Sequence, residues 1–195
     1  MAANKPETWP AGLVLEYDVL SRTEEAATIG FIEASSLEYP SYDPGNSRSS
    51  SSFGWKYDFS TDSFRKCPEI PPEMTPLCER AAGMIGVAAS DIAECLFNRY
   101  DPGAVIQPHF DKDVWEHVVG VSLGSVATMR FVRPSEAGGG QCDIRLPPRS
   151  MYVLKGDARY EWMHSLLPVT DTRWSITLRT LSELGKAQKS EQLVA

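Results

Sequence analysis

The sequence predicts an α+β protein whose N-terminal helices pack on one sheet of a jelly-roll (double-stranded β-helix) core. Three observations lead to this fold class. Short β-type runs, separated by turn residues at regular intervals, fill the chain from about residue 94 to 181. Two segments with helix-capping signals precede them. The 14 glycines and 14 prolines among 195 residues are typical of a protein with many turns.

The first predicted elements are a strand and a helix. "GLVLEYDVL" (12–20) alternates between apolar and polar residues, which indicates a strand. "SRTEEAATIGFIEA" (21–34) predicts a helix with Ser21 as N-cap, and Glu24 completes a capping box.

The next segment predicts a loop, an aromatic strand and a second helix. Residues 39–52 are rich in Pro, Gly, Asn and Ser, so we expect a mobile surface loop. "FGWKYDF" (53–59) alternates as a strand, and "PPEMTPLCERAAGMIG" (71–86) has Pro at its start and Gly at its end, as helices do. We expect the polar residues 183–195 to form a tail that frays.

The remaining predicted strands follow one another at regular spacing, which favours an antiparallel sandwich or barrel over a parallel α/β sheet. In chain order they are "ECLFNRY", "HVVGVSLG", "VATMRFVRP", "QCDIRLPP", "SMYVLKG", "YEWMHSLL" and "RWSITLRTL". A chain of this length fits one domain, and we expect residues 1–195 to form one.

Composition limits the classes of function. The net charge of −7 argues against a general polyanion-binding protein, although a local basic surface can exist on an acidic chain. The four cysteines are widely spaced without a CxxC pair, which favours free thiols in a reducing compartment. No apolar run approaches the roughly 18 residues of a membrane helix. We expect a cytoplasmic monomer that does not bind membranes.

"QPHFDKD" (107–113) contains a candidate metal site. On a strand, His109 and Asp111 point to the same face. A second imidazole from a distant strand would complete a 2-His-1-carboxylate triad, which holds Fe(II) and leaves positions open. Such a pair alone arises by chance in roughly one chain in seven of this composition, so a third ligand must be found. His117 is too close along the chain, and His164 is favoured because the sheet can fold back over the longer interval.

"RWSITLR" (173–179) contains a candidate anion site. Arg173 and Arg179 lie on the same face of one predicted strand as Ser175 and Thr177. An oxygenase with this triad needs a reductant, and 2-oxoglutarate chelates the metal through its keto-acid end. Its distal carboxylate then suits a guanidinium. The alternative is two arginines at strand ends whose charged heads reach solvent.

Four blocks together resemble the AlkB family of Fe(II)/2-oxoglutarate dioxygenases. They are "NRYDPGAVIQPHFDKD", "VSLGSVATMRF", "LPPRSMYVLKGDARYEWMH" and "RWSITLR". The resemblance covers residues 94–181 closely and is weaker from "FGWKYDF" onward. It implies a jelly-roll catalytic core at 91–182 with iron at one mouth, an N-terminal extension with a nucleotide-recognition lid at 12–90, and the polar tail at 183–195.

The resemblance also implies roles for individual residues. His109, Asp111 and His164 match the iron ligands. The residues that match the 2-oxoglutarate site are Asn98, Tyr100, Arg173, Thr177 and Arg179. Arg173 matches the arginine that grips the distal carboxylate, and Arg179 the one near the chelating end. The chain departs from the AlkB archetype at Gly120, where that protein has a serine, and at Ser175, which replaces an asparagine. We expect both departures to loosen the pocket and leave its charges in place.

The chemistry implied uses Fe(II), 2-oxoglutarate and O₂. 2-Oxoglutarate becomes succinate and CO₂, and a substrate carbon is hydroxylated. On an alkylated base of DNA or RNA, the product releases an aldehyde. The repair members of the family flip the damaged base into a pocket and stack it on aromatic rings. Trp55 and Tyr57 match the lid, and Asp113 matches an aspartate that contacts the base, although a solvated loop carboxylate is an equal alternative. The basic residues available for phosphates are Lys56, Arg65, Lys66, Arg130, Arg133, Arg145 and Arg149.

Other functions stay open. "FGWKYDF" and "LPPRSMYVLKGDARYEWMH" look closer to the AlkB-homologue domain of the tRNA wobble-uridine hydroxylase than to AlkB itself. A protein or lipid hydroxylase is a further alternative, and a metal-free jelly-roll binding module is a third. We expect no RNA-recognition or methyltransferase domain beside this one, and Asp113 matches a base contact, so repair of alkylated nucleic acid is favoured.

Overall fold

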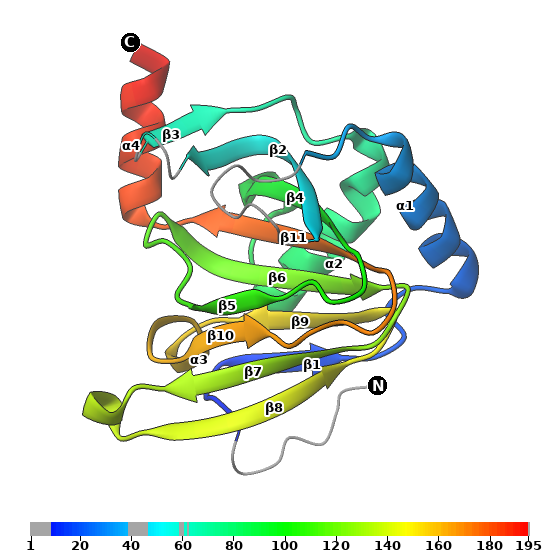
Figure 1. Cartoon of the computed structure of the whole chain (residues 1–195). Helices are drawn as coiled ribbons and strands as arrows, with labels where there is room; N and C mark the ends of the chain where they lie inside the picture. The colour runs from blue at the N-terminus through cyan, green and yellow to red at the C-terminus, as the bar shows by residue number, and fades with distance from the viewer. Residues whose placement is uncertain (1–8, 39–46, 59–60, 62, 195) are drawn as a thin grey trace.

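Two antiparallel sheets stack face to face in the computed structural model, which describes residues 9–38, 47–58, 61 and 63–194 (Figure 1). The larger sheet has the strand order β1-β9-β6-β11-β4-β2-β3, and the smaller has the order β5-β10-β7-β8. This arrangement confirms the predicted α+β jelly roll.

The strands of the larger sheet, in spatial order, are β1 (Leu13–Glu16), β9 (Ser150–Leu154), β6 (Trp115–Leu123), β11 (Arg173–Leu181), β4 (Ile92–Tyr100), β2 (Arg48–Asp58) and β3 (Ser63–Lys66). Those of the smaller sheet are β5 (Ile106–His109), β10 (Met163–Leu166), β7 (Ala127–Arg133) and β8 (Gly140–Leu146). The helices are α1 (Arg22–Ala34), α2 (Thr75–Ile85), α3 (Asp157–Tyr160) and α4 (Glu183–Val194), and short 3-10 turns occupy Pro72–Met74, Ala89–Asp91 and Ser135–Ala137.

Both N-terminal helices cover the outer face of the larger sheet. The predicted capping box starts α1, because the Glu24 amide donates to Ser21 Oγ at 3.1 Å and the Ser21 amide donates to the Glu24 carboxylate at 2.7 Å. Gly86 ends α2 in the left-handed conformation, with φ of 75°. The apolar faces of these helices join the outward side chains of the sheet in one buried cluster, which includes Ile32, Leu77, Ala81, Val121, Ile176 and Leu178. Burial of each such large side chain contributes about 1.5–3 kcal/mol.

The predicted loop at 39–52 is wrong in its last part. Residues 39–46 lie outside the described residues, but β2 begins at Arg48 and includes the serine run. Its partner is β4, with Arg48 opposite Tyr100 and Gly54 opposite Glu94. Serine has a low strand propensity, so the regular ladder to β4 overrides the local signal. The first strand is also shorter than predicted, since β1 covers only Leu13–Glu16.

The predicted fraying tail is also wrong, because Glu183–Val194 forms α4 and contacts β3. Gly185 lets the first turn of α4 lie against the segment before β6, since a Cβ there would lie 2.2 Å from the carbonyl oxygen of Val114. The Ser182 hydroxyl donates to the carbonyl of Asp113 at 2.5 Å and accepts from the Gly185 amide at 3.2 Å, which fixes the start of the helix. No helix among the described residues is long and apolar enough to cross a membrane.

Candidate active site

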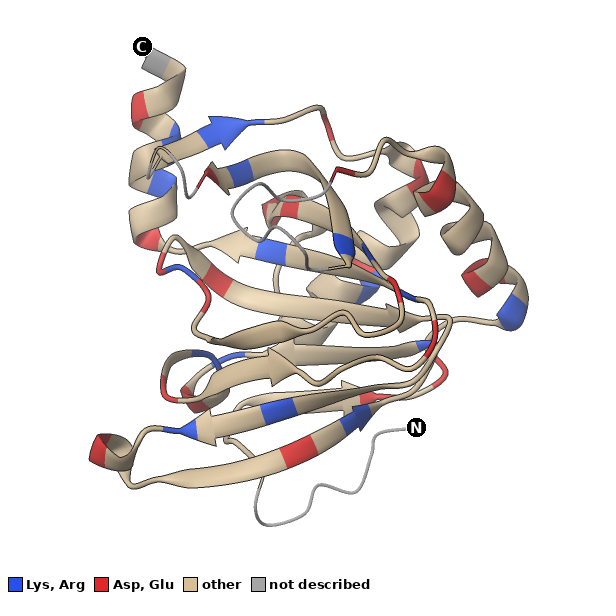
Figure 2. Cartoon of the chain, viewed as in Figure 1, with Lys and Arg blue, Asp and Glu red and all other residues tan. Residues whose placement is uncertain are grey.

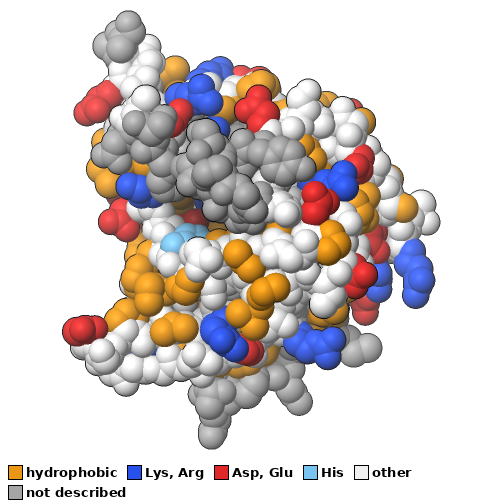
Figure 3. Space-filling model, in the orientation of Figure 1, with side chains coloured by type: hydrophobic (Ala, Val, Ile, Leu, Met, Phe, Trp, Pro, Cys, Tyr) orange, Lys and Arg blue, Asp and Glu red, His pale blue; other side chains and the backbone are white. Residues whose placement is uncertain are grey.

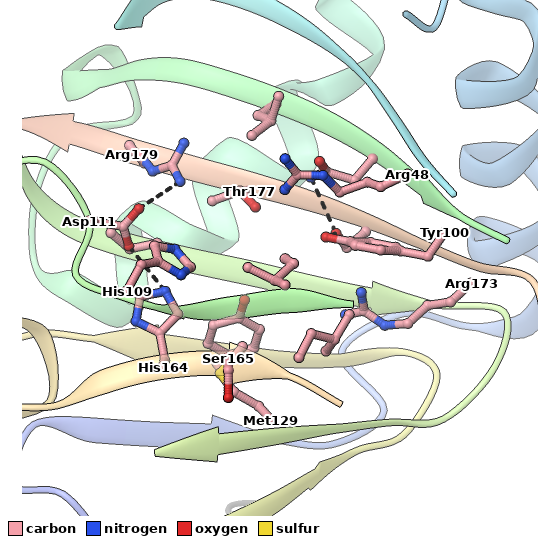
Figure 4. A pocket seen from close by; sticks show the side chains of 17 residues that line it. Arg48, Tyr100, His109, Asp111, Met129, His164, Ser165, Arg173, Thr177 and Arg179 are labelled. Carbon is pink, nitrogen blue, oxygen red and sulfur yellow. Dashed lines mark hydrogen bonds and ion pairs between the residues drawn. The ribbon is translucent and has the colours of Figure 1, made fainter. Parts of the chain in front are cut away.

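A pocket lies between the two sheets and is lined by inward side chains of both. Figure 4 shows its two ends: His109, Asp111 and His164 gather at one, and Tyr100 and Arg173 lie at the other. Arg173, Ser175, Thr177 and Arg179 of β11 all contribute to the wall, as the strand period predicts.

The two predicted histidine ligands lie opposite each other on neighbouring strands, and the predicted aspartate ligand lies close to both. β5 and β10 are antiparallel, and His109 and His164 are direct cross-strand partners with ring centroids 4.4 Å apart. Asp111 follows the end of β5, and one ligand atom from each of the three residues lies within 4.8 Å of the others. This is the donor set and spacing of a facial triad.

Hydrogen bonds and burial prepare these groups to bind a cation. His109 Nδ1 lies 2.8 Å from the carbonyl oxygen of Gln107, so Nδ1 carries the proton and Nε2 keeps its lone pair for a metal. Burial lowers the pKa of His164 to about 4, although the Asp111 carboxylate opposes the shift. His164 is therefore neutral at pH 7. Its Nε2 lies 3.5 Å from Asp111 Oδ2, a buried oxygen without a hydrogen bond in the described part of the chain. An orphaned carboxylate oxygen beside two imidazole lone pairs fits Fe(II).

Arg179 orients the carboxylate from the opposite side. It donates to Asp111 Oδ1 at 2.8 Å and to Glu94 Oε2 at 2.5 Å. Burial disfavours the charge on Arg179, but the two carboxylates outweigh it and raise the pKa of the guanidinium above its ordinary value. Burial alone would raise the pKa of Asp111; Arg179 and the two histidines outweigh it and hold this pKa well below its usual range. Asp111 is thus ionised and held with one oxygen free for a metal.

Glu94 is a site residue that the sequence analysis missed. It is 3% exposed and forms an ion pair with Arg179. The signal was present, because Glu94 lies in strand phase with Asn98 and Tyr100, which both face the pocket.

At the far end of the pocket, Arg173 is a buried cation without an ion pair among the described residues. It is 2% exposed, its Nε donates to Ser122 Oγ at 3.3 Å, and its guanidinium lies 4.9 Å from the ring centroid of Tyr100. Because a buried charge without a counter-ion is costly, this end fits the distal carboxylate of 2-oxoglutarate. Asn98 Oδ1 is also buried without a hydrogen bond in the described chain, and Thr177 lines the wall between the two ends.

A third arginine lines this part of the pocket. Arg48 of β2 stands opposite Tyr100 in the sheet and beside it in Figure 4. The sequence did not indicate Arg48 as a pocket residue, because residue 48 falls in the segment predicted to be a loop.

The two departures from the AlkB archetype differ in effect. At Gly120 the expected loosening is wrong: the ring of Tyr152 fills the space, and a Cβ at residue 120 would lie 2.1 Å from Tyr152 Cζ. At Ser175 the hydroxyl joins the pocket wall, 3.5 Å from Asn98 Nδ2 and 3.4 Å from the hydroxyl of Tyr100.

The predicted base-contacting residues lie outside the pocket lining. Trp55 is 7% exposed and stacks on Phe64, with centroids 5.3 Å apart. Tyr57 is buried, and the ammonium of Lys112 lies 4.6 Å from its ring centroid. Asp113 is exposed beside the metal-binding loop. Stacking of a base on Trp55 therefore stays a prediction and requires the lid to rearrange.

Phe110, which stands between two metal ligands, is 41% exposed and was not singled out from the sequence. On the face of the molecule drawn in Figure 3, a histidine reaches the surface, and hydrophobic side chains lie near it.

Most of the candidate phosphate-binding cations are paired with acids. Arg130 makes two hydrogen bonds of 2.7 Å to the Asp143 carboxylate, and Arg149 binds Glu25 at 2.9 Å. The other pairs are Arg133 with Glu161, Arg65 with Asp58 and Lys66 with Glu69. Figure 2 shows basic and acidic residues interspersed along β7 and β8. These pairs weaken the basis for a continuous basic track.

His117 lies outside the site, as expected. Its Nδ1 is 3.1 Å from the hydroxyl of Thr180, so it is a hydrogen-bonded histidine of the sheet.

Comparison with known proteins identifies the group to which this geometry corresponds. The model of the 2OG-Fe(II) oxygenase superfamily matches residues 38–189. The tRNA (carboxymethyluridine(34)-5-O)-methyltransferase alkbh8 of Xenopus tropicalis is 26% identical over 164 residues, which are 82% of this chain and 26% of that protein. The alpha-ketoglutarate-dependent dioxygenase AlkB of Escherichia coli is 40% identical over 67 residues, 33% of this chain and 31% of AlkB.

Two further matches concern a viral protein and a solved structure. An uncharacterized protein of Acanthamoeba polyphaga mimivirus is 38% identical over 101 residues, 45% of this chain and 48% of that protein. The chain thus spans between a quarter and a half of the length of these relatives. The structure of OsALKBH1 superposes with a TM-score of 0.71 over 92% of this chain and 100% of that chain; its 17% identity shows the shared fold alone.

Proposed function

Because the chain belongs to the 2OG-Fe(II) oxygenase superfamily, as an AlkB-type member, we propose that it catalyses oxidative dealkylation of bases in DNA or RNA. The observation that carries the oxygenase chemistry is the pocket with a His-Asp-His cluster at one end and, at the other, a buried Arg173 that has no ion pair in the described part of the chain. The similarity to AlkB and alkbh8 supports a nucleic-acid substrate.

Residues at different points along the pocket have different roles. His109, Asp111 and His164 would hold Fe(II), which together with 2-oxoglutarate and O₂ supplies the oxidising power. Arg173 binds the distal carboxylate of 2-oxoglutarate, with Asn98, Tyr100 and Thr177 as the wall around it. Arg179 holds the Asp111 carboxylate with one oxygen turned to the metal.

2-Oxoglutarate loses CO₂ and takes up one atom of O₂ to become succinate, and the other atom enters a C–H bond of the N-alkyl group. The hydroxylated carbon then leaves as an aldehyde while its hydroxyl proton passes to the nitrogen. Asp113 contacts the base in this proposal, and Trp55 and Tyr57 belong to a lid that opens to admit it. The protein acts as a cytoplasmic monomer.

A second candidate is hydroxylation of a modified tRNA wobble uridine. It is favoured by the extent of similarity, since the match to alkbh8 covers 82% of this chain and the match to AlkB covers 33%.

Succinate formation with Fe(II), ascorbate and a panel of nucleic acids distinguishes these substrates. The panel contains 1-methyladenine, 3-methylcytosine, ethenoadenine and a tRNA stem with the wobble uridine, and the Asp111→Ala variant is the inactive control. We expect succinate coupled to loss of an alkyl lesion. Coupling to the tRNA stem alone would replace dealkylation by wobble-uridine hydroxylation. Succinate formation uncoupled from all four would contradict a nucleic-acid substrate and direct the search to proteins or lipids.

A further inference from the structure

Tyr152 enters the pocket across a position where this chain has no side chain. In the larger sheet, Tyr152 of β9 is the cross-strand partner of Gly120 of β6, and Gly120 is in turn the partner of Thr177 of β11. An added Cβ at residue 120 would lie 2.1–2.3 Å from Tyr152 Cζ, Cε1 and the hydroxyl oxygen. The ring therefore lies directly over the glycine and points toward β11. A side chain at residue 120 would force it out.

The Tyr152 hydroxyl has no hydrogen-bond partner in the described part of the chain. Its side chain is nevertheless among the pocket-lining groups, and the residue is only 8% exposed. The hydroxyl oxygen is not one of the fully buried polar atoms without a partner, so it is open to the pocket, where a ligand can reach it. A ligand that carries an acceptor into the pocket would supply a partner.

Tyr152 lines the same pocket as Arg173, the residue expected to bind the distal carboxylate of 2-oxoglutarate. Ser122, two residues from Gly120 on the same face of β6, accepts a hydrogen bond from Arg173 Nε at 3.3 Å. Ser122 is thus next to the cross-strand residues Tyr152, Gly120 and Thr177 on this face, and Arg173 binds Ser122. Burial raises the pKa of Tyr152 above its ordinary value, and Arg173 is the strongest of the charges that oppose this shift. The hydroxyl is protonated at neutral pH and able to donate.

We propose that Tyr152 is a co-substrate-binding residue whose hydroxyl donates a hydrogen bond to the distal carboxylate of 2-oxoglutarate beside Arg173, and that Gly120 is the residue that gives it access. The departure at Gly120 thus adds a donor to the pocket. The assignment rests on the proposed function only in taking 2-oxoglutarate as the co-substrate, so it holds whichever base, protein or lipid is oxidised.

Tyr152→Phe tests the hydroxyl while keeping the ring that fills the space over Gly120. 2-Oxoglutarate is titrated into the Fe(II)-loaded protein without O₂, and the heat of binding gives Kd. We expect Kd to rise by about tenfold to a hundredfold, the range for losing one hydrogen bond to a charged group. Tyr160→Phe, at an exposed tyrosine, is the matched control and should leave Kd unchanged. A Kd within twofold of wild type for Tyr152→Phe would overturn the proposal.

A co-substrate analogue shows which end of the ligand is bound. 2-Oxopentanoate keeps the chelating keto-acid and has a methyl group in place of the distal carboxylate. Tyr152→Phe should weaken its binding less than twofold. An equal loss for both ligands would mean that the hydroxyl acts on the chelating end or on the pocket as a whole, and would also overturn the assignment.

The role of Gly120 is tested by coupling it to Tyr152. Gly120→Ala should lower stability to urea in the wild-type background, because the methyl group overlaps the ring. In a Tyr152→Ala background the same change should have little effect. Equal destabilisation in both backgrounds would show that the two residues do not interact, and would remove Gly120 from the proposal.

Discussion

On β11, alternate residues face two different surroundings. Ile176 and Leu178 point outward into the cluster formed with α1 and α2, and both are fully buried among carbon atoms. Arg173, Thr177 and Arg179 point inward and line the pocket. The two faces belong to the same nine residues of backbone, so the difference lies in what each face has as a partner.

The side chains of the outer face find their packing partners within the described chain, whereas several polar groups of the inner face lack a partner there. Outward side chains pack against many neighbours, so their contribution is to the free energy of unfolding. The inward groups include a buried guanidinium without an ion pair in the described chain, and carboxylate and amide oxygens without hydrogen bonds. Such groups add little to folding and gain partners from a ligand. Substitutions on the two faces should therefore affect different measurements.

The largest effect is expected at the metal end of the inner face. Asp111→Ala removes the only carboxylate of the triad, so Fe(II) binding at micromolar concentration and succinate formation should both fall to background. Anaerobic Fe(II) titration and a succinate assay measure this. Asp113→Ala, an exposed acid nearby, is the control for iron binding. Stoichiometric iron binding by Asp111→Ala with wild-type affinity would exclude the proposed ligand set.

At the other end, Arg173→Gln should weaken 2-oxoglutarate binding by about a hundredfold, within the range of about 2–5 kcal/mol for removing one member of a buried charge pair. Stability without ligand should stay the same or rise, because a buried charge without an ion pair is removed. Calorimetric titration of 2-oxoglutarate and urea unfolding give the two quantities. A fall in iron affinity with an unchanged affinity for 2-oxoglutarate would show that Arg173 has another role.

On the outer face, Ile176→Ala should lower the free energy of unfolding by about 2–5 kcal/mol, since it leaves a cavity under α2. The Kd of 2-oxoglutarate for the folded protein should stay within twofold of wild type. Urea unfolding followed by circular dichroism, together with titration below the unfolding transition, measures both. A large change in Kd would mean that the two faces of the sheet are coupled.

The smallest effect is expected at the edge of the outer layer. Ser21→Ala removes the side-chain acceptor that starts α1 and should lower the free energy of unfolding by about 1 kcal/mol, with no effect on the pocket. Ser21→Asp keeps an acceptor and should restore most of the loss. If Ser21→Asp were as unstable as Ser21→Ala, the capping explanation would be wrong.

The sequence predicted best those features that depend on local patterns. The α1 capping box, the alternation of β11 and the pairing of His109 with Asp111 each need only a few neighbouring residues, and all lie where expected. His164 was found because the chain offers few histidines.

Features that depend on a distant strand were missed. The segment 48–52 is a strand because β4 pairs with it, so Arg48 went unnoticed as a pocket residue. The helical end of the chain is held by contacts at Gly185 with the Val114 loop, which no local pattern indicates. Gly120 was expected to loosen the pocket. Instead the ring of Tyr152 fills the space beside it, and only the register of β6 and β9 brings these two residues together.

The overlap between residue 120 and the ring of Tyr152 also constrains the order in which the pair can have arisen. A serine at residue 120 would collide with the tyrosine at residue 152, because even its Cβ would lie 2.1 Å from the ring. Any route from a side chain at residue 120 to the present pair would therefore need the glycine before the tyrosine. Once the tyrosine is present, a side chain at residue 120 is blocked until residue 152 changes. The tyrosine thus makes the loss of the side chain at residue 120 hard to reverse.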